Sequence, residues 1–260
     1  MKAEKKRLES LHIVFTSAFD GYLHLAPIDW SPQRVLDIGC GTGTWCIEMA
    51  DSYPGAEVIG VDLKAFQPFL VPPNLSFEID DVEEEWTWNR SFDYIHARYM
   101  AGTICDWPRL IRQCFDNCIS GGWVEFQDMD SIYVAHEASV SKEGRILQWL
   151  AYSCNINDLS ELAIHLDSTF AQWMHGAGFI NIHIVKRVLP LDVLAEDLKS
   201  EGGLYSETQL HGGPSDMNRE SFEDAPGWAS GQVDAFIDDI RRDHPSVTLY
   251  TVYGQKPIHE

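Results

Sequence analysis

The sequence is poor in basic residues. It has 260 residues, with 19 Lys and Arg against 40 Asp and Glu, and its formal net charge is −21. Nucleic acids and anionic membranes both attract clustered Lys and Arg, so this balance argues against a partner of either kind. The sequence also lacks the roughly 18 consecutive apolar residues that a membrane span needs, and its first residues lead into no apolar signal segment. We therefore expect a soluble, cytoplasmic protein.

The sequence also lacks the usual spacings of metal-binding or disulfide-bonded cysteines. None of its six cysteines forms a CxxC pair or the spacing of a zinc finger, so we expect small buried side chains and no metal site. It contains no internal repeat and no low-complexity segment. Hydrophobic residues make up 45% of the chain, enough for a substantial core. We therefore expect residues 1–260 to form a single domain.

Short apolar strands alternate with amphipathic helices in the first half of the chain. Because the strands are uniformly apolar, this alternation predicts a mostly parallel sheet covered by helices on both faces, a doubly wound α/β fold. A glycine pair, Gly121-Gly122, is expected to break the chain before the fifth strand, and Gly176 with Gly178 to end the later helix. The predicted strands cover residues 34–38, 57–63, 75–79, 92–96, 123–127, 180–184 and 247–253, the last of them antiparallel. The predicted helices cover 5–20, 44–52, 107–118 and 158–175, and one more is marked by Val233, Phe236, Ile237 and Ile240.

The regular alternation of strands and helices ends after residue 130. Residues 195–228 are rich in Gly, Ser, Asp and Glu, which is typical of a long loop. We expect residues 1–30 to form a helical N-terminal cap and residues 31–130 to form the ligand-binding core. Residues 131–178 and 190–245 are expected to form a lid of helices and loops on the substrate side.

Residues 35–43, with the sequence VLDIGCGTG, are the most informative segment. A strand, a glycine turn and a helix in succession form the geometry of a nucleotide site. Gly39, Gly41 and Gly43 allow a sharp bend and let a ligand approach the backbone without a Cβ in the way. The third glycine comes one residue too early for a dinucleotide motif, and no Lys-Ser or Lys-Thr follows. The ligand therefore need not carry a phosphate.

Acidic residues follow the next two strands. Asp62 ends the second strand, where its carboxylate is placed to accept hydrogen bonds from both hydroxyls of a ribose. Asp80 and Asp81 follow the third strand, where a carboxylate together with the Val82 amide suits the exocyclic amine of adenine. The alternative is a solvated face, because residues 78–85 carry six acids in all.

Five segments together resemble the class I S-adenosylmethionine-dependent methyltransferases: VLDIGCGTG, VIGVDL, FEIDDVEEEW, FDYIHARYMAGTICDWPRL and GGWVEFQDMD. The spacing of the later segments is most similar to the fungal LaeA-like methyltransferases of secondary metabolism. The resemblance implies a Rossmann-like methyltransferase fold with S-adenosyl-L-methionine as cofactor. It also implies a set of cofactor-binding residues, namely Asp37, Gly39, Cys40, Gly41, Gly43, Asp62, Leu63, Asp80, Asp81, Val82 and Ala97.

The resemblance also implies which residues bind which part of the cofactor. The Gly39–Gly43 backbone would hold its methionine end, and Asp37 its amino group through a water. Asp62 would hold the ribose, and Asp81 with Val82 the adenine. The backbone around Ala97 and Arg98 would close over the methionine moiety.

The sequence indicates the catalytic and acceptor-binding residues less clearly than the cofactor-binding residues. His96, at the carboxyl end of the fourth strand, is a candidate base, and a structural histidine is the alternative. Arg98 is a candidate partner for a carboxylate of the acceptor or cofactor, and a structural salt bridge is the alternative. Packing is likewise the alternative for the candidate acceptor-binding residues, which are His12, Tyr22, His24, Trp149 and Trp173.

The expected function is transfer of a methyl group from S-adenosylmethionine to an oxygen, hydroxyl or carboxyl, of a small-molecule secondary metabolite. Three alternatives stay open at this point. The first is a cyclase that uses the methyltransferase scaffold without methyl transfer, the second a non-catalytic LaeA-like regulator, and the third a protein methyltransferase. The sequence does not set the oligomeric state.

Overall fold

The computed structural model describes residues 2–28, 32–101, 103–129, 166–190 and 246–258. They belong mainly to one compact unit, made of Met1–Asp128, His165–Arg187 and Tyr250–Glu260; the second unit, Met129–Ile164 with Val188–Leu249, lies mostly outside the described residues. The predicted lid, 131–178 and 190–245, falls largely outside them as well, and so does Trp149. The division into cap, core and lid therefore stays a prediction.

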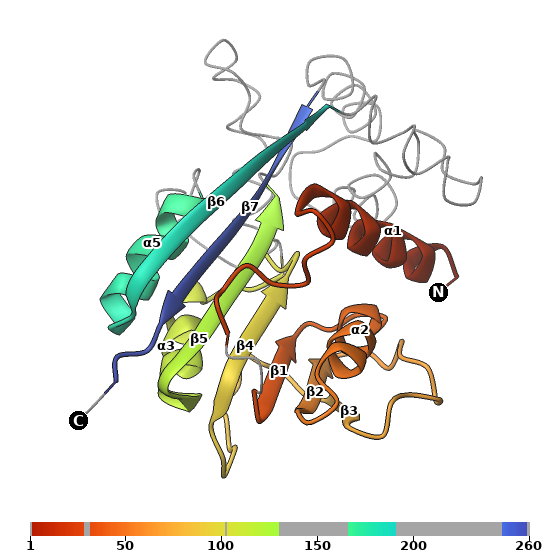
Figure 1. Cartoon of the computed structure of the whole chain (residues 1–260), viewed down its shortest axis with the longest axis horizontal. Helices are drawn as coiled ribbons and strands as arrows, with labels where there is room; N and C mark the ends of the chain where they lie inside the picture. Colours follow the sequence, from red (N-terminus) through yellow and green to blue (C-terminus); the bar gives the residue numbers. More distant parts are fainter. Residues whose placement is uncertain (1, 29–31, 102, 130–165, 191–245, 259–260) are drawn as a thin grey trace, which may run out of the picture. The chain divides into compact units, whose positions relative to one another are not determined.

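Seven strands form one sheet in the order β3-β2-β1-β4-β5-β7-β6 (Figure 1). The elements in chain order are α1 (Lys2–Ala18), β1 (Arg34–Ile38), α2 (Thr44–Ser52), β2 (Glu57–Asp62), β3 (Leu75–Ile79), β4 (Phe92–Arg98), α3 (Trp107–Asn117), β5 (Cys118–Met129), α5 (Leu166–Ala177), β6 (Ile180–Pro190) and β7 (Ser246–Gln255).

The sheet is parallel from β3 through β5, and Asp37 on β1 lies level with Gly60 on β2 and His96 on β4. β7 runs in the opposite direction in Figure 1, and its end exchanges two backbone hydrogen bonds with β5, between Lys256 and the pair Gly121 and Gly122. This confirms the predicted α/β fold. The chain reverses its direction of winding between β1 and β4, and ligands bind at the carboxyl ends of strands at such a switch point.

Two hydrophobic cores lie on opposite faces of the sheet. On one face, α2 packs Trp45 and Met49 against β1, β2 and β4. On the other face, α3 packs Leu110 and α5 packs Phe170 against β4, β5 and β7. Helices therefore cover both faces, as the uniformly apolar strands predict.

Of the two expectations about glycines, the first is wrong and the second holds for Gly178 but not for Gly176. The pair Gly121-Gly122 lies inside β5, which begins at Cys118, and the backbone groups of both glycines pair with Lys256, the residue directly after β7. Gly176 lies inside α5, and the helix ends only at Ala177 before the left-handed Gly178 (φ +106°). Among the described residues, no helix is long and apolar enough to cross a membrane.

Candidate active site

The turn after β1 is built on left-handed glycines. Gly39, Gly41 and Gly43 have φ values of +68°, +54° and +77°, a region that costs other residues about 1–2 kcal/mol. A Cβ at Gly39 would overlap the Met100 side chain, and one at Gly43 would overlap Phe77. The turn therefore requires glycine at these positions.

Asp62 lies directly beside this turn. Its Oδ2 accepts a hydrogen bond from the Gly41 amide at 2.8 Å, and its Oδ1 accepts one from the Lys64 amide at 2.9 Å. Two backbone groups thus fix the carboxylate at the carboxyl edge of the sheet. The next side chain, Leu63, is 65% exposed and adds an apolar surface to this edge. The structure brings together the glycine turn and the acid that sequence reasoning paired with it.

Sequence reasoning missed Gln67, which also holds the turn. Its Nε2 donates to the Gly41 carbonyl oxygen at 2.7 Å and to the Lys64 carbonyl oxygen at 3.2 Å. The loop after β2 therefore folds back over the glycine turn. Gln67 follows an exposed stretch without any motif, so the sequence held no signal for it.

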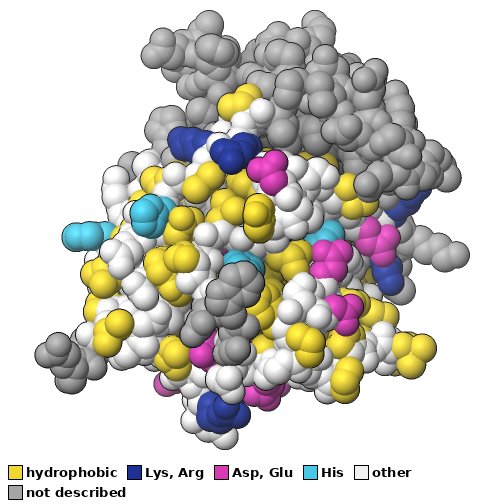
Figure 2. Space-filling view, in the orientation of Figure 1, with side chains coloured by type: hydrophobic (Ala, Val, Ile, Leu, Met, Phe, Trp, Pro, Cys, Tyr) yellow, Lys and Arg dark blue, Asp and Glu magenta, His cyan; other side chains and the backbone are white. Residues whose placement is uncertain are grey.

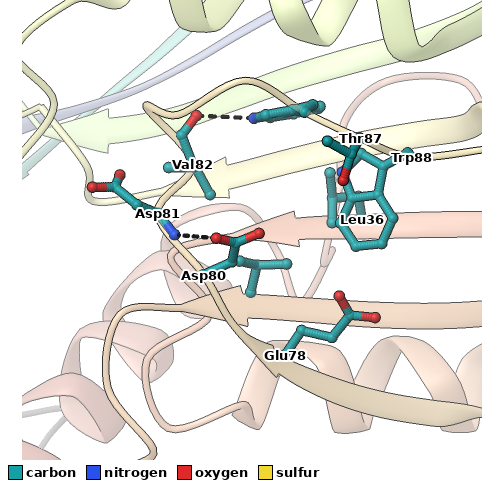
Figure 3. A pocket seen from close by; sticks show the side chains of 9 residues that line it. Leu36, Glu78, Asp80, Asp81, Val82, Thr87 and Trp88 are labelled. Carbon is teal, nitrogen blue, oxygen red and sulfur yellow. Dashed lines mark hydrogen bonds between the residues drawn. The ribbon is translucent and has the colours of Figure 1, made fainter.

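A pocket opens next to the acidic loop that follows β3 (Figure 3). The carboxylates of Glu78 and Asp80 point to one side of the chain, whereas the carboxylate of Asp81 points away from them. Asp80 Oδ1 accepts a hydrogen bond from the Asp81 amide, and Asp81 Oδ1 accepts one from the Glu83 amide. Val82 lines the same pocket with Trp86, Thr87 and Trp88. The candidate adenine residues thus share one pocket.

The acidic loop is fastened to the start of α3. Glu83 Oε1 accepts hydrogen bonds from the amides of Cys105 and Asp106, at 3.0 and 2.8 Å. Gln113 donates to the Val82 carbonyl oxygen and accepts from the Trp86 amide. These contacts give Glu83 a structural role that sequence reasoning missed, and they join the acidic loop to residues 105–113.

His96 is fully enclosed. It is 1% exposed, its ring stacks on Trp45 with centroids 3.9 Å apart, and its Nδ1 lies 2.7 Å from Asp37 Oδ1. Cys46 donates to the other Asp37 oxygen at 3.1 Å. Burial lowers the pKa of His96 in spite of the adjacent carboxylate, which favours the neutral imidazole. The structure therefore favours the structural alternative for His96 over the role of a base that reaches an acceptor.

Arg98 is engaged by the protein itself. Its Nε donates to Gln127 Oε1 at 2.8 Å, its Nη1 to His12 Nδ1 at 3.1 Å, and its Nη2 lies 3.5 Å from the Leu23 carbonyl oxygen. Burial lowers the pKa of Arg98 to about 10. The structural alternative is favoured here as well, with an uncharged glutamine and histidine in place of the expected salt bridge.

The candidate histidines of the N-terminal region are also held in hydrogen bonds. Because a guanidinium only donates, His12 Nδ1 accepts from Arg98, and its Nε2–H donates to Glu48 at 3.1 Å. This bond lowers the pKa of Glu48. His24 donates from Nδ1 to the Ala26 carbonyl oxygen and pairs through Nε2 with the Tyr53 hydroxyl. Both histidines therefore have structural partners.

The two other described acceptor candidates differ from each other. Tyr22 is 63% exposed and stays a candidate. Trp173 packs on α5 against Phe170 in an edge-to-face contact, with ring centroids 5.7 Å apart. Packing accounts for Trp173, so the structure gives no support to its acceptor role.

The chain after β4 closes over the glycine turn. Ala97 is buried, and Tyr99 has a left-handed backbone (φ +58°). The amides of Met100 and Ala101 both donate to Asp128 Oδ2, at 2.9 and 2.7 Å, and the Met100 side chain lies over Gly39. Sequence reasoning missed Asp128, although the residue stands at the end of a predicted strand.

The last features of the site region are its surface charge and its possible metal ligands. On the face shown in Figure 2, acidic side chains near α1 and α2 lie beside Lys and Arg side chains, and the described part of α1 carries Lys5, Lys6 and Arg7 against Glu9. In the part of the chain that the structure describes, no three His, Cys, Asp or Glu side chains lie close enough to hold a metal ion.

Comparison with known proteins identifies the family. Residues 10–184 match the model of a methyltransferase domain. The chain belongs to this methyltransferase family. It is 32% identical over 268 residues to "Methyltransferase pytC" of Aspergillus terreus, covering 98% of this chain and 82% of that protein. It is 39% identical over 269 residues to "Secondary metabolism regulator laeA" of Aspergillus fumigatus, covering 98% and 71%. The relatives are thus fungal proteins of the LaeA-like methyltransferase group.

Solved structures of methyltransferases share the fold. Phosphoethanolamine N-methyltransferase 2 of Haemonchus contortus, in complex with S-adenosyl-L-methionine, superposes with a TM-score of 0.55 at 16% identity, over 94% of this chain and 53% of that chain. The [4+2]-cyclase SpnF superposes with a TM-score of 0.53 at 17% identity, over 88% and 76%. At these identities, the likeness establishes the Rossmann-like methyltransferase fold.

Proposed function

We propose that this protein transfers a methyl group from S-adenosyl-L-methionine to an oxygen of a small-molecule secondary metabolite. The observation that carries the proposal is the glycine turn with the anchored Asp62 at the carboxyl edge of β1 and β2. The family match makes S-adenosyl-L-methionine the cofactor.

The residues present suit this cofactor. Three left-handed glycines give the turn the sharp bend that a nucleotide site needs, and the side chains of Met100 and Phe77 pack where Cβ atoms of Gly39 and Gly43 would lie. Asp62 presents a fixed carboxylate for the ribose hydroxyls, and the Asp80–Val82 loop, which lines a pocket, is proposed to hold the adenine. Leu63 and Ile79, both exposed at the ends of β2 and β3, offer apolar contact to a flat base.

When bound, this cofactor supplies a methyl group on a positively charged sulfur, which is already reactive toward nucleophiles. The protein's part is then to bind, orient and exclude water, and orientation alone reduces such barriers by roughly 7–11 kcal/mol. The Gly39–Gly43 backbone would hold the amino-acid end and Asp62 the ribose.

The acceptor is proposed to be a carboxylate or an acidic hydroxyl. A base is needed only where the acceptor is protonated at the working pH. Within the described residues, His96 is enclosed and Arg98 is held by Gln127 and His12, so neither is placed to take a proton from an acceptor. An oxygen that ionises without help needs no such group.

A non-catalytic regulatory role is the second candidate, and one observation favours it. The chain is 39% identical to a laeA protein described as a regulator of secondary metabolism. The cyclase alternative rests on the shared fold alone, and the protein-methyltransferase alternative has no support among the described contacts.

Product mass separates these functions. We would incubate the protein with S-adenosylmethionine and a pool of fungal carboxylic acids and phenols, and follow the mixture by mass spectrometry. Methyl transfer adds one CH2 to the acceptor, about 14 Da, and yields one S-adenosylhomocysteine per product. Cyclisation changes the compound without a change in mass. A regulator would give neither product nor S-adenosylhomocysteine, which would overturn the proposal.

A further inference from the structure

A buried carboxylate on β5 has no part in the cofactor site described so far. Glu125 is 0% exposed and lies level with His96 in the parallel pair of β4 and β5. A buried charge is costly unless hydrogen bonds compensate it. Three N–H groups point at this carboxylate and supply hydrogen bonds of this kind.

Two of these N–H groups belong to the backbone that follows α1. The Leu25 amide lies 3.0 Å from both Glu125 oxygens, and the Ala26 amide donates to Oε2 at 2.7 Å. The third donor is Gln127 Nε2, at 2.6 Å from Oε1. Glu125 therefore joins the centre of the sheet to a segment about a hundred residues earlier in the chain.

The same segment is held at a second point, the Leu23 carbonyl oxygen. Trp45 Nε1 donates to it at 2.9 Å and Gln127 Nε2 at 3.3 Å, while Arg98 Nη2 lies 3.5 Å away. In Figure 1 this segment crosses in front of β5 and β4 on its way from α1 to β1. Residues 23–26 thus lie across the sheet and are held by side chains of β4, β5 and α2.

Holding this segment also places α1 at the cofactor turn. The Leu8 side chain lies 3.3 Å from where a Cβ of Gly41 would be, and the Arg7 guanidinium lies over the Tyr99 ring. His12 of α1 joins Arg98 to Glu48. The helix therefore covers the carboxyl ends of β1 and β4, next to the proposed methionine site.

We propose that Glu125 is a positioning residue that holds the N-terminal cap, here α1 with residues 19–28, closed over the cofactor turn. The expected consequence is slower release of the cofactor, and this part of the inference rests on the proposed function. The hold itself depends only on the contacts of Leu25 and Ala26 with the carboxylate.

Glu125→Gln tests the hold. The substitution keeps the size of the side chain but replaces one acceptor oxygen by a donor, so a buried N–H loses its acceptor. We expect amide hydrogen exchange in peptides of residues 19–28 to become at least about tenfold faster, with β2 and β3 unchanged. Release of S-adenosylhomocysteine, followed by stopped-flow fluorescence, should become faster as well.

Asp93→Asn is the matched control. Asp93 Oδ2 also accepts a backbone amide, that of Arg34, but at the amino ends of β1 and β4, away from the cap. The Asp93→Asn substitution should leave amide hydrogen exchange in residues 19–28 unchanged. Unchanged cap exchange in folded Glu125→Gln, or an equal increase throughout the sheet, would overturn the proposal, because the carboxylate would then only contribute to general stability.

A second variant keeps the proposal testable if Glu125→Gln does not fold. Trp45→Phe removes the N–H that donates to the Leu23 carbonyl oxygen, together with part of the ring that stacks on His96. A smaller increase of exchange in residues 19–28 is expected, and no increase there would contradict the account. Exchange needs no turnover: if the cap opens in the variants while the wild-type protein binds no S-adenosylhomocysteine, the proposed function fails and the hold on the cap stands.

Discussion

The carboxyl edge of the sheet has two halves that are built differently. In the cofactor half, β1, β2 and β3 present a bent backbone, and the fixed polar groups lie close in sequence: Asp62 is 21 residues from Gly41, and Gln67 is 26. In the cap half, β4 and β5 present buried side chains whose partners are remote: Glu125 is 100 residues from Leu25, and Arg98 is 86 from His12.

This difference separates ligand binding from closure. The cofactor half exposes Leu63 and the pocket of the Asp80–Val82 loop, so substitutions there should act on affinity. In the cap half, His96, Arg98 and Glu125 are each held by hydrogen bonds within the protein, although His96 Nε2 is buried without a hydrogen-bond partner among the described residues. Substitutions there should act on stability and on how long a ligand stays bound. The predictions below test this separation.

The largest effect is expected from Asp62→Ala. The variant loses two charge-assisted hydrogen bonds that fix the turn as well as the ribose acceptor, each worth roughly 1.5–3 kcal/mol. We expect S-adenosylmethionine to bind about 100-fold more weakly in calorimetric titration. Asp51→Ala, the same change at an exposed position near the end of α2, serves as control and should bind normally. Wild-type affinity of Asp62→Ala would show that this carboxylate does not hold the cofactor.

Gly39→Ala is expected to have the next largest effect. The left-handed backbone costs an alanine about 1–2 kcal/mol, and the new Cβ would displace the Met100 side chain. Cofactor affinity should fall about tenfold or more. Gly55→Ala is the matched control, because a Cβ there meets no atom within 4 Å. Equal affinities of the two variants would contradict the proposed role of the turn.

The sequence predicts the cofactor half of the edge better than the cap half. The glycine turn and Asp62 were predicted because backbone conformation and strand ends leave local signals, such as glycines at fixed spacing. Most strand limits followed from short apolar runs in the same way. The roles of Glu125 and Gln127 were not predictable, because their partners are backbone groups about a hundred residues away. The partners of His96 and Arg98, among them Asp37, Gln127 and His12, lie 29 to 86 residues away and left no local signal either.

His96→Asn should change stability and its pH dependence more than cofactor affinity. Because burial lowers the pKa of His96 in the folded state, the unfolded chain binds this proton more readily below its ordinary pKa of about 6.5. The wild-type protein therefore loses stability as the pH falls through that value, by up to about 1.4 kcal/mol per pH unit from this group. Urea unfolding at about pH 7.5 and 5.5 measures it.

The asparagine variant lacks this titration, so its stability should depend less on pH over the same range. An identical pH dependence of both proteins would show that His96 does not titrate as inferred. A large loss of turnover in the variant, with normal cofactor affinity and normal stability, would return His96 to the role of a base.

The smallest effect is expected from Trp173→Phe. The side chain packs against Phe170 in the core beside α5, so the change should lower the melting temperature by a few degrees, about 1 kcal/mol of lost packing. The KM for an acceptor should change by less than about twofold, which steady-state kinetics would measure. A tenfold rise in KM at unchanged stability would place Trp173 at the acceptor after all.

The central claim is that the carboxyl edge of β1 and β2 holds the cofactor. A crystal structure of the protein with S-adenosylhomocysteine tests it most directly. The account predicts the amino-acid end of the ligand along the Gly39–Gly43 backbone and both ribose hydroxyls within hydrogen-bond distance of Asp62. A ligand bound elsewhere, or ribose hydroxyls turned away from Asp62, would contradict it.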